Sequence, residues 1–198
     1  MEPPAAAGGG GVASSARRMP RLIVFDLDAC LWTPEMFELD AAPKEYDSAR
    51  NGVIAGGDVV RLFPGALSVL RSIEREARFA DVQVAVASST TRPDYANACL
   101  DRLVVSPERG TTVGALVQQR EIYPSSKGRA HFPALQKALG IPYGEMLFFD
   151  DCTYGDNCAD VAACCPGVVC VRTPSGLSEA LFHRGLDAFA RGETGVVA

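Results

Sequence analysis

The fold predicted for this chain of 198 residues is decided by the segment LIVFDLD at residues 22–28. Its first four residues are apolar and two of them are β-branched, which is typical of a parallel strand covered on both faces. The strand runs directly into Asp26 and Asp28. Because ligands in an open α/β sheet bind beyond the carboxyl ends of the strands, both carboxylates are predicted at the functional edge of the sheet.

The same pattern recurs along the chain. Further short apolar runs are predicted as strands at residues 82–87, 113–117, 146–149 and 168–171. Amphipathic stretches are predicted as helices at residues 64–78, 93–103, 127–139, 157–165 and 177–191. This alternation predicts an α/β fold, a three-layer open parallel sheet of Rossmann-like form with right-handed crossovers.

Residues 32–62 interrupt the alternation, because prolines, Asn51-Gly52 and Gly56-Gly57 separate short apolar pieces. The stretch is predicted to be a loop with a small hairpin that turns at Asn51-Gly52. It is too short to be a second domain. We therefore expect a minimal cap insertion that lies over the sheet without closing it.

The ends of the chain differ in composition. Residues 1–19 are mostly Ala, Gly, Pro and Ser, which predicts a disordered low-complexity tail, with an organelle transit peptide as the alternative. Residues 20–198 are predicted to form one domain, because the remaining length suits a single core.

Charge and composition limit the partners and the cellular location expected for the protein. The net charge is −5 and the basic residues are scattered, so no nucleic-acid partner is expected. No apolar run reaches the roughly 20 residues of a bilayer span, so no membrane partner is expected. The seven cysteines are odd in number and irregularly spaced, which predicts reduced thiols and a cytoplasmic location. Oligomeric state is left open.

Polar residues follow the predicted strands where ligands are expected. They are Asp26 and Asp28 after the first strand, Ser88, Ser89, Thr90 and Thr91 after the second, Lys127 beyond the third, and Asp150 and Asp151 after the fourth. Carboxylates, hydroxyls and one lysine are therefore expected to converge at one edge.

This set suits phosphoryl transfer. A carboxylate at Asp26 can attack phosphorus to form an aspartyl-phosphate, while Asp28 carries the proton. Bringing a carboxylate to an anionic phosphate requires positive charge, which Mg²⁺ and Lys127 can supply. The predicted magnesium ligands are Asp26, Asp28 through its carbonyl, and one of Asp150 and Asp151, with Asp150 favoured.

Each piece alone has a simpler explanation. An Asp-x-Asp at a strand end is common, an Asp-Asp pair often caps a helix, and a single lysine at a helix start is usually solvated. Two positions are considered for Trp32, beside the substrate entrance or packed in the core. His131 and His183 have no partners at ligand spacing and are interpreted as structural or surface residues. The ordered occurrence of the polar set after successive strands favours the catalytic interpretation.

The motifs resemble those of the haloacid-dehalogenase (HAD) superfamily, and in particular its eukaryotic magnesium-dependent phosphatase branch. The resemblance rests on LIVFDLDACLW at residues 22–32, QREIYPSSK at 119–127 and FFDD at 148–151, and covers about residues 20–191. It implies Asp26 as nucleophile, Asp28 as general acid/base, Ser88 and Ser89 as phosphate-binding residues, Lys127 as the charge-balancing lysine, and Asp150 and Asp151 as metal-side carboxylates. The implied substrates are phosphotyrosine or sugar-derived phosphates.

The sequence departs from that pattern at three places. Cys30 replaces the usual Thr of the first motif, and its weaker hydrogen bonding is expected to orient Asp28 less firmly. Ser89 stands where the branch has Arg, with Arg92 as a nearby substitute. Residues 152–157 are about two residues longer than the branch pattern.

Three functions compete. A phosphomonoesterase agrees with every motif. A phosphomutase is disfavoured, because mutases of this superfamily generally use a capping domain that this chain lacks. A catalytically weakened phosphate-binding or interaction module would explain Cys30 and Ser89, but intact Asp26, Asp28 and Lys127 argue against it.

Overall fold

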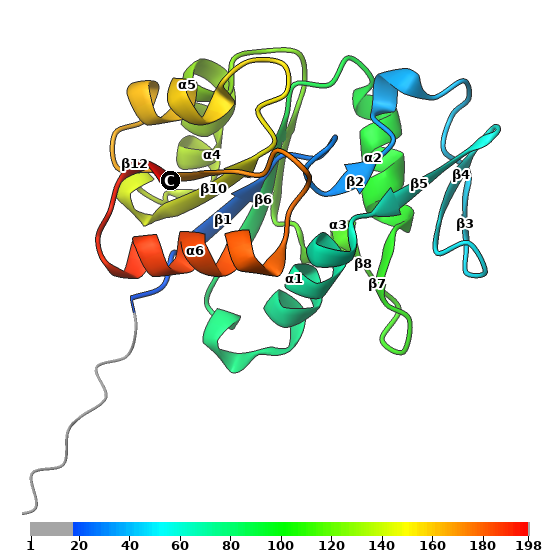
Figure 1. Ribbon diagram of the computed structural model, residues 1–198, viewed down its shortest axis with the longest axis horizontal. Coiled ribbons are helices and arrows are strands. Elements are labelled where there is room, and N and C mark those ends of the chain that lie inside the picture. The colour runs from blue at the N-terminus through cyan, green and yellow to red at the C-terminus, as the bar shows by residue number, and fades with distance from the viewer. Residues whose placement is uncertain (1–17, 198) are drawn as a thin grey trace, which may run out of the picture.

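The computed structural model describes residues 18–197 (Figure 1). A six-stranded sheet lies at its centre in the order β12-β11-β10-β1-β6-β9, and every neighbouring pair is parallel. Its strands are β1 (Leu22–Phe25), β6 (Gln83–Ser88), β9 (Gln119–Ile122), β10 (Met146–Asp150), β11 (Val169–Arg172) and β12 (Gly195–Val197).

Helices cover both faces of this sheet, which explains the unbroken apolar run of β1. Ile23 and Phe25 pack with α1 (Pro64–Arg75), α2 (Pro93–Arg102) and α6 (Glu179–Ala190), whereas Leu22 and Val24 pack with α4 (Phe132–Leu139) and α5 (Asn157–Cys164). In Figure 1, α1 and α6 lie on the opposite side of the sheet from α4 and α5. The predicted three-layer α/β fold is therefore confirmed.

The insertion contains more strand than the sequence indicated. It forms an antiparallel sheet in the order β2-β5-β4-β3 beside the main sheet (Figure 1). Its strands are β2 (Trp32–Thr33), β3 (Glu45–Asp47), β4 (Gly52–Ala55) and β5 (Asp58–Leu62). The predicted hairpin is the β3–β4 pair, in which Asp47 is opposite Gly52 and Asn51 has a φ of 50°. The β4–β5 pair, which turns at Gly56-Gly57, was not predicted.

The strand predicted at residues 113–117 is wrong. These residues form the short helix α3 (Val113–Leu116), and the Thr112 side chain caps it by accepting from the Ala115 N–H at 3.3 Å. The sheet strand is instead β9, whose sequence QREI is mostly polar. As the last strand of the sheet, β9 has one neighbour, so Gln119 and Arg120 stay partly exposed while Ile122 is buried.

The predicted helices agree with the structure to within a few residues. The helix expected at 64–78 ends at Arg75, the one expected at 127–139 begins as a π-helix, and the last begins after the N-cap Ser178. The remaining short elements are η1 (Met36–Glu38), η2 (Ala77–Phe79), β7 (Val104–Ser106), β8 (Thr111–Thr112), η3 (Lys127–His131) and η4 (Tyr143–Glu145).

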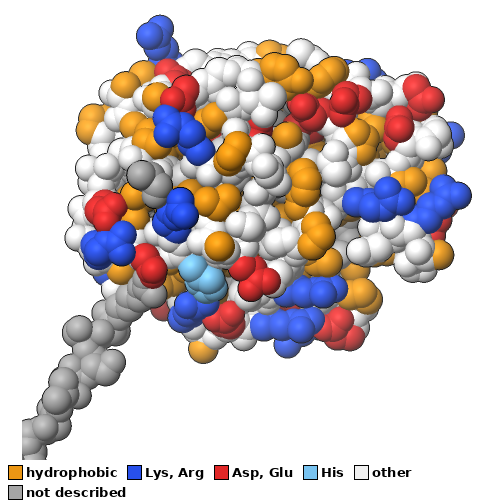
Figure 2. All heavy atoms as spheres, in the orientation of Figure 1, with side chains coloured by type: hydrophobic (Ala, Val, Ile, Leu, Met, Phe, Trp, Pro, Cys, Tyr) orange, Lys and Arg blue, Asp and Glu red, His pale blue; other side chains and the backbone are white. Residues whose placement is uncertain are grey.

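Most of the predicted tail lies outside the described residues, but its last two residues belong to the fold. The Arg18 guanidinium lies 4.3 Å from the centre of the Phe189 ring and donates to the Gly144 carbonyl at 2.8 Å. Met19 packs against the buried core. Within residues 18–197, no helix has both the length and the apolar character needed to cross a membrane. Charges of both signs are interspersed on the face drawn in Figure 2.

Candidate active site

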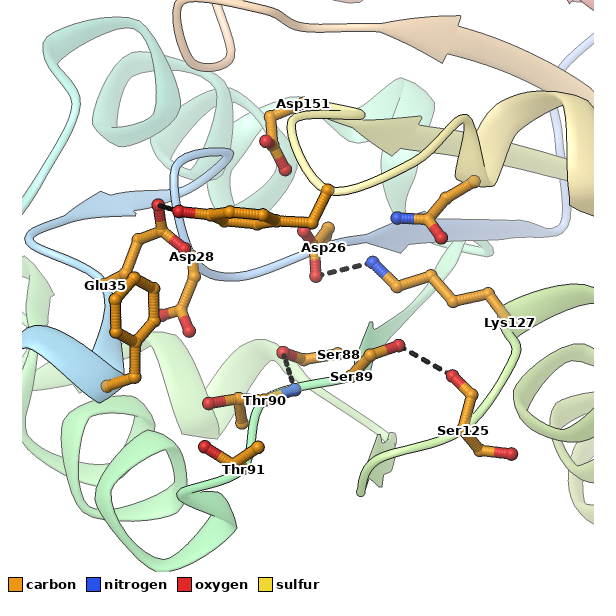
Figure 3. Close-up of a pocket in the computed structure, with 13 residues that line it drawn as sticks. Asp26, Asp28, Glu35, Ser88, Ser89, Thr90, Thr91, Ser125, Lys127 and Asp151 are labelled. Atoms are coloured by element: carbon orange, nitrogen blue, oxygen red, sulfur yellow. Dashed lines mark hydrogen bonds and ion pairs between the residues drawn. The ribbon is translucent and has the colours of Figure 1, made fainter.

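Lys127 joins the ends of two neighbouring strands. Asp26 directly follows β1 and Asp150 ends β10, and both carboxylates are almost completely buried. The Lys127 Nζ lies 2.7 Å from Asp26 Oδ1 and 2.5 Å from Asp150 Oδ2. Asp26 also lines the cavity shown in Figure 3, so its carboxylate is paired with Lys127 at the edge of the open space.

The position of Lys127 depends on the contact between its helix and α5. The π-helix η3 begins at Lys127, and π-turns of this kind are frequent at functional sites. Asp160 of α5 accepts from the Ser126 hydroxyl at 2.7 Å and from the Gly128 N–H at 3.0 Å. A Cβ on residue 128 would lie 2.7 Å from the Asp160 carbonyl oxygen, so the close approach requires glycine. Asp160 could not be predicted from the sequence, because an acidic residue on a helix is usually solvated.

Burial and the neighbouring charges shift the pKa values of Asp26 and Lys127. Desolvation raises the pKa of Asp26 well above its usual range; Lys127 opposes the shift, while Asp150 and Asp151 add to it. Burial lowers the pKa of Lys127, but the charges of Asp26 and Asp150 outweigh burial and leave this pKa above its usual range. The lysine is therefore a fixed positive charge between two carboxylates.

A cation site lies beside this lysine. Asp26, Asp150 and Asp151 each offer a carboxylate oxygen, and these atoms lie within 4.8 Å of one another. Three buried carboxylates face one lysine, so the group has an excess of negative charge. Hard oxygen donors in this arrangement fit a divalent cation such as Mg²⁺.

The two adjacent aspartates differ in what they contact. Asp150 Oδ1 accepts from the Cys152 N–H at 2.8 Å and from Asn157 Nδ2 at 3.1 Å, while its Oδ2 accepts from Lys127. Asp151 lines the cavity and accepts from the Thr153 N–H through one oxygen at 2.8 Å. Asp150 is thus engaged at both oxygens, and Asp151 faces the open space.

Asp28 is held by Trp32. The indole Nε1 donates to Asp28 Oδ1 at 2.7 Å, and the Trp32 side chain is fully buried. The choice left open by the sequence is therefore settled in favour of core packing, with the polar edge of the ring on Asp28. Burial raises the pKa of Asp28, and the hydrogen bond from Trp32 partly offsets the rise. A carboxyl with a raised pKa is suited to proton transfer.

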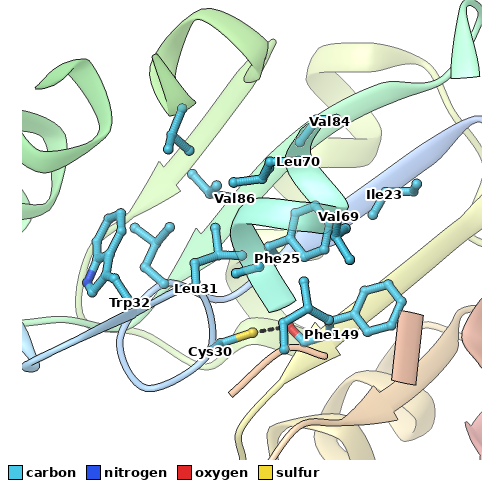
Figure 4. Close-up of a cluster of buried hydrophobic side chains, with 14 of the residues drawn as sticks. Ile23, Phe25, Cys30, Leu31, Trp32, Val69, Leu70, Val84, Val86 and Phe149 are labelled. Carbon is cyan, nitrogen blue, oxygen red and sulfur yellow. Dashed lines mark hydrogen bonds between the residues drawn. The ribbon is translucent and has the colours of Figure 1, made fainter. Parts of the chain in front are cut away.

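Cys30 does not orient Asp28. Its thiol is buried, donates to the Phe149 carbonyl at 3.7 Å and accepts from the Thr173 hydroxyl at 3.4 Å (Figure 4). The expectation that Cys30 would loosen Asp28 is therefore not met, because the thiol is buried in the core and its hydrogen bonds go to Phe149 and Thr173. Arg92, the proposed substitute for a missing arginine, lies over the Tyr95 ring at 3.7 Å and does not line the cavity.

In Figure 3 the two serines lie across the cavity from Asp151, and both line it. Ser88 is buried, and its Oγ accepts from the Thr90 N–H at 3.4 Å. The Ser89 hydroxyl donates to the Ser125 carbonyl at 2.8 Å and so ties this loop to the one before Lys127. The Ser88 Oγ accepts in its bond with Thr90 and can still donate its proton to a phosphate, whereas the Ser89 proton is given to Ser125.

The cavity has a volume of about 470 Å³, within the range of small-molecule sites. Of the residues predicted at this edge, all but Asp150 line the cavity, and they are Asp26, Asp28, Ser88, Ser89, Thr90, Thr91, Lys127 and Asp151. The sequence missed further lining residues, which are Glu35, Phe37, Ser125, Tyr154 and Asn157. They come from the insertion, from the loops before Lys127 and after Asp151, and from the first residue of α5, where residue type alone does not indicate a place in the site. His131 lies outside the cavity, buried against Tyr123 with its Nε2 3.0 Å from the Tyr123 carbonyl.

Comparison with known proteins agrees with this site. The acid phosphatase family model matches residues 18–192, which include every residue of the cavity. The chain belongs to the acid phosphatase family. The family is one of phosphoric monoester hydrolases, so the predicted enzyme class is confirmed.

Two curated relatives place this phosphatase in the predicted superfamily. Human magnesium-dependent phosphatase 1 is 34% identical over 180 residues, which are 90% of this chain and 92% of the relative. The HAD-like hydrolase superfamily protein P8B7.31 of Schizosaccharomyces pombe is 32% identical over 136 residues, 67% of this chain and 76% of that one. The predicted resemblance to HAD phosphatases is therefore confirmed.

A solved structure shares the fold of this phosphatase. It is the phosphatase domain in the N-terminal part of the protein BF1531 from Bacteroides fragilis, complexed with Mg. The TM-score is 0.54 at 15% identity, over 88% of this chain and 39% of that chain. At this identity the likeness supports the α/β fold alone.

Proposed function

We propose that the protein is a magnesium-dependent phosphatase that hydrolyses phosphomonoesters through an aspartyl-phosphate on Asp26. The observation that carries the proposal is the position of Asp26, which lines the cavity and has one carboxylate oxygen 2.7 Å from the Lys127 Nζ. A carboxylate fixed in this way is oriented for attack on phosphorus.

The reaction has two steps. In the first, an Asp26 oxygen forms a bond to phosphorus, the ester oxygen leaves, and Asp28 gives that oxygen a proton. In the second, Asp28 takes a proton from water as the water oxygen attacks phosphorus, which releases inorganic phosphate and regenerates Asp26. Lys127 offsets the charge of Asp26, and the Ser88 hydroxyl donates to a phosphate oxygen. Ser89 lines the same cavity but gives its hydroxyl proton to the Ser125 carbonyl, so we assign it to holding this loop beside the phosphate.

Asp26, Asp151 and the Asp28 carbonyl are the proposed magnesium ligands. The bound ion would supply positive charge to the phosphoryl oxygens. Asp151 replaces the ligand favoured from the sequence, because Asp150 already accepts hydrogen bonds at both oxygens. Asp150 instead positions Lys127.

Phosphotyrosine and sugar-derived phosphates are the proposed substrate classes, in keeping with the open cavity. The alternative, a weakened phosphate-binding module, is disfavoured because the Asp26–Lys127–Asp150 group is intact and Cys30 does not touch Asp28. A cytoplasmic location remains a proposal from the cysteine content.

Hydrolysis of para-nitrophenyl phosphate tests the proposed function. We expect turnover with Mg²⁺, none after removal of divalent ions with a chelator, and poor turnover with Ca²⁺, because the larger ion takes more ligands in irregular geometry. Rates should be measured at matched ion concentrations. Equal rates in the two ions would contradict the proposed ligand set, and no hydrolysis in any ion would favour the binding module.

The assignment of Asp151 is tested by a matched pair of variants. Asp151→Asn is expected to raise the Mg²⁺ concentration for half-maximal activity about tenfold or more, the size of effect that altering a metal site typically produces. Asp150→Asn is expected to lower the maximal rate with a smaller change in that concentration, because it loosens Lys127 rather than removing a ligand. Magnesium titrations of the two variants measure both quantities. The reverse pattern would mean that Asp150, rather than Asp151, binds the magnesium ion directly.

A further inference from the structure

Two exposed aromatic rings lie at the rim of the cavity. Phe37 and Tyr154 are the exposed large apolar side chains among residues 18–197, with 54% and 72% of their surface accessible. Both line the cavity, and the centres of their rings are 6.1 Å apart at an interplanar angle of 79°. Large exposed apolar side chains next to a binding site usually contact a ligand.

The rings come from two separate segments. Phe37 belongs to η1 in the insertion, and Tyr154 lies in the loop between β10 and α5. The Tyr154 hydroxyl donates to Glu35 Oε1 at 3.4 Å, and the Glu35 N–H donates to Glu38 Oε2 at 2.8 Å. A hydrogen bond therefore holds Tyr154, and Phe37 is placed by its short helix and by contact with the Tyr154 ring, so the aromatic pair is partly preorganised.

The charge at this rim is negative. The charged residues that line the cavity are Lys127, which pairs with buried carboxylates, and the four acids Asp26, Asp28, Glu35 and Asp151. Figure 3 places Glu35 on the opposite side of Asp26 from Lys127. A substrate whose phosphate lies at Asp26 would therefore extend its leaving group toward two rings and a carboxylate.

We propose that Phe37, Tyr154 and Glu35 form a leaving-group subsite that selects aryl phosphates whose ring carries no negative charge. The inference rests on the proposed phosphatase function. The rings contribute apolar contact and edge-to-face or stacked geometry with a third ring. Glu35 repels a carboxylate or second phosphate on the leaving group, so substrates whose leaving group carries such a charge are disfavoured.

The aromatic half of the subsite is tested with a double variant, Phe37→Ala with Tyr154→Ala, on phenyl phosphate and on acetyl phosphate, which has no ring. The ratio of kcat/KM for phenyl phosphate to that for acetyl phosphate is expected to fall about tenfold, mainly through KM, because ring contacts form on binding. Tyr154→Phe keeps the ring and loses only the hydroxyl bond to Glu35, so it should keep most of the ratio.

The charged half is tested with two phosphates of one ring, 4-carbamoylphenyl phosphate and 4-carboxyphenyl phosphate. Wild-type enzyme is expected to favour the neutral amide several-fold in kcat/KM, and Glu35→Gln should remove most of that preference. Glu45→Gln is the matched control, because Glu45 is an exposed acid on β3 that does not line the cavity. The preference should weaken as salt is added.

The outcomes separate the subsite from the proposed function. If wild-type enzyme with Mg²⁺ hydrolyses neither phenyl phosphate nor para-nitrophenyl phosphate, the proposed function fails. If it hydrolyses phenyl phosphate and acetyl phosphate and the double variant loses both in equal proportion, the aromatic subsite is overturned while the phosphatase stands. If 4-carboxyphenyl phosphate is hydrolysed as well as the amide, or Glu45→Gln acts like Glu35→Gln, selection by Glu35 is overturned.

Discussion

Asp26→Asn is expected to reduce turnover of every phosphomonoester by at least about a thousandfold, because loss of a covalent nucleophile removes the first chemical step. Asparagine has the same shape and its side-chain oxygen can still accept from Lys127, so the geometry of the site should be kept. Steady-state hydrolysis of para-nitrophenyl phosphate with saturating Mg²⁺ measures the loss. Residual activity within tenfold of wild type would exclude Asp26 as nucleophile.

The stability of this variant provides the control. Wild-type protein buries Asp26, Asp150 and Asp151 around one lysine, and burial together with the neighbouring carboxylates raises the pKa of Asp26. Removing one negative charge leaves Lys127 paired with Asp150. Asp26→Asn should therefore unfold in metal-free buffer at a denaturant concentration no lower than wild type. An inactive variant that is also unstable would leave the loss of activity attributable to misfolding, and Asp26→Glu, which keeps the charge but displaces it, would then decide the role.

The sequence identified the buried strands well because both faces of the sheet are covered. In β1 and β10 every residue is buried, so an unbroken apolar run was sufficient evidence. An apolar run did not reveal β9. This strand is at the edge of the sheet and is partly exposed, so the polar residues Gln119 and Arg120 are tolerated in it. Residues 113–117 were predicted as a strand because they are mostly apolar. Val113 is indeed buried in the core, but it begins a helix that is capped by Thr112.

The candidate site was predictable to the extent that topology alone assembles it. Asp26, Ser88 and Asp150 end adjacent parallel strands, so their convergence follows from the strand order. The contacts that hold Lys127 were not predictable, because Asp160 reaches η3 only through the packing of α5. The aromatic rim was missed for a similar reason, since Phe37 and Tyr154 are 117 residues apart in the chain and meet only in the folded structure.

Asp28→Asn is expected to separate the two proton transfers assigned to this residue. The variant keeps an oxygen that can accept from Trp32, so the side chain should stay in place. Without a proton donor, an alkyl alcohol leaves poorly, whereas para-nitrophenolate leaves readily. Formation of the aspartyl-phosphate should therefore slow by about 10²–10⁴-fold for an alkyl phosphate and much less for para-nitrophenyl phosphate.

Hydrolysis of the aspartyl-phosphate should slow with either substrate, because water then lacks a base in the second step. The expected trace for Asp28→Asn with para-nitrophenyl phosphate is a burst of nitrophenol that approaches the enzyme concentration, followed by a slow steady state. Rapid-mixing kinetics measure the burst, and acid quenching of the same reaction allows the phosphoryl group on Asp26 to be found by mass spectrometry. Equal slowing of phosphoenzyme formation for alkyl and nitrophenyl substrates would mean that Asp28 holds the shape of the site beside Trp32 rather than carrying the proton, since a purely positional role cannot distinguish a good leaving group from a poor one.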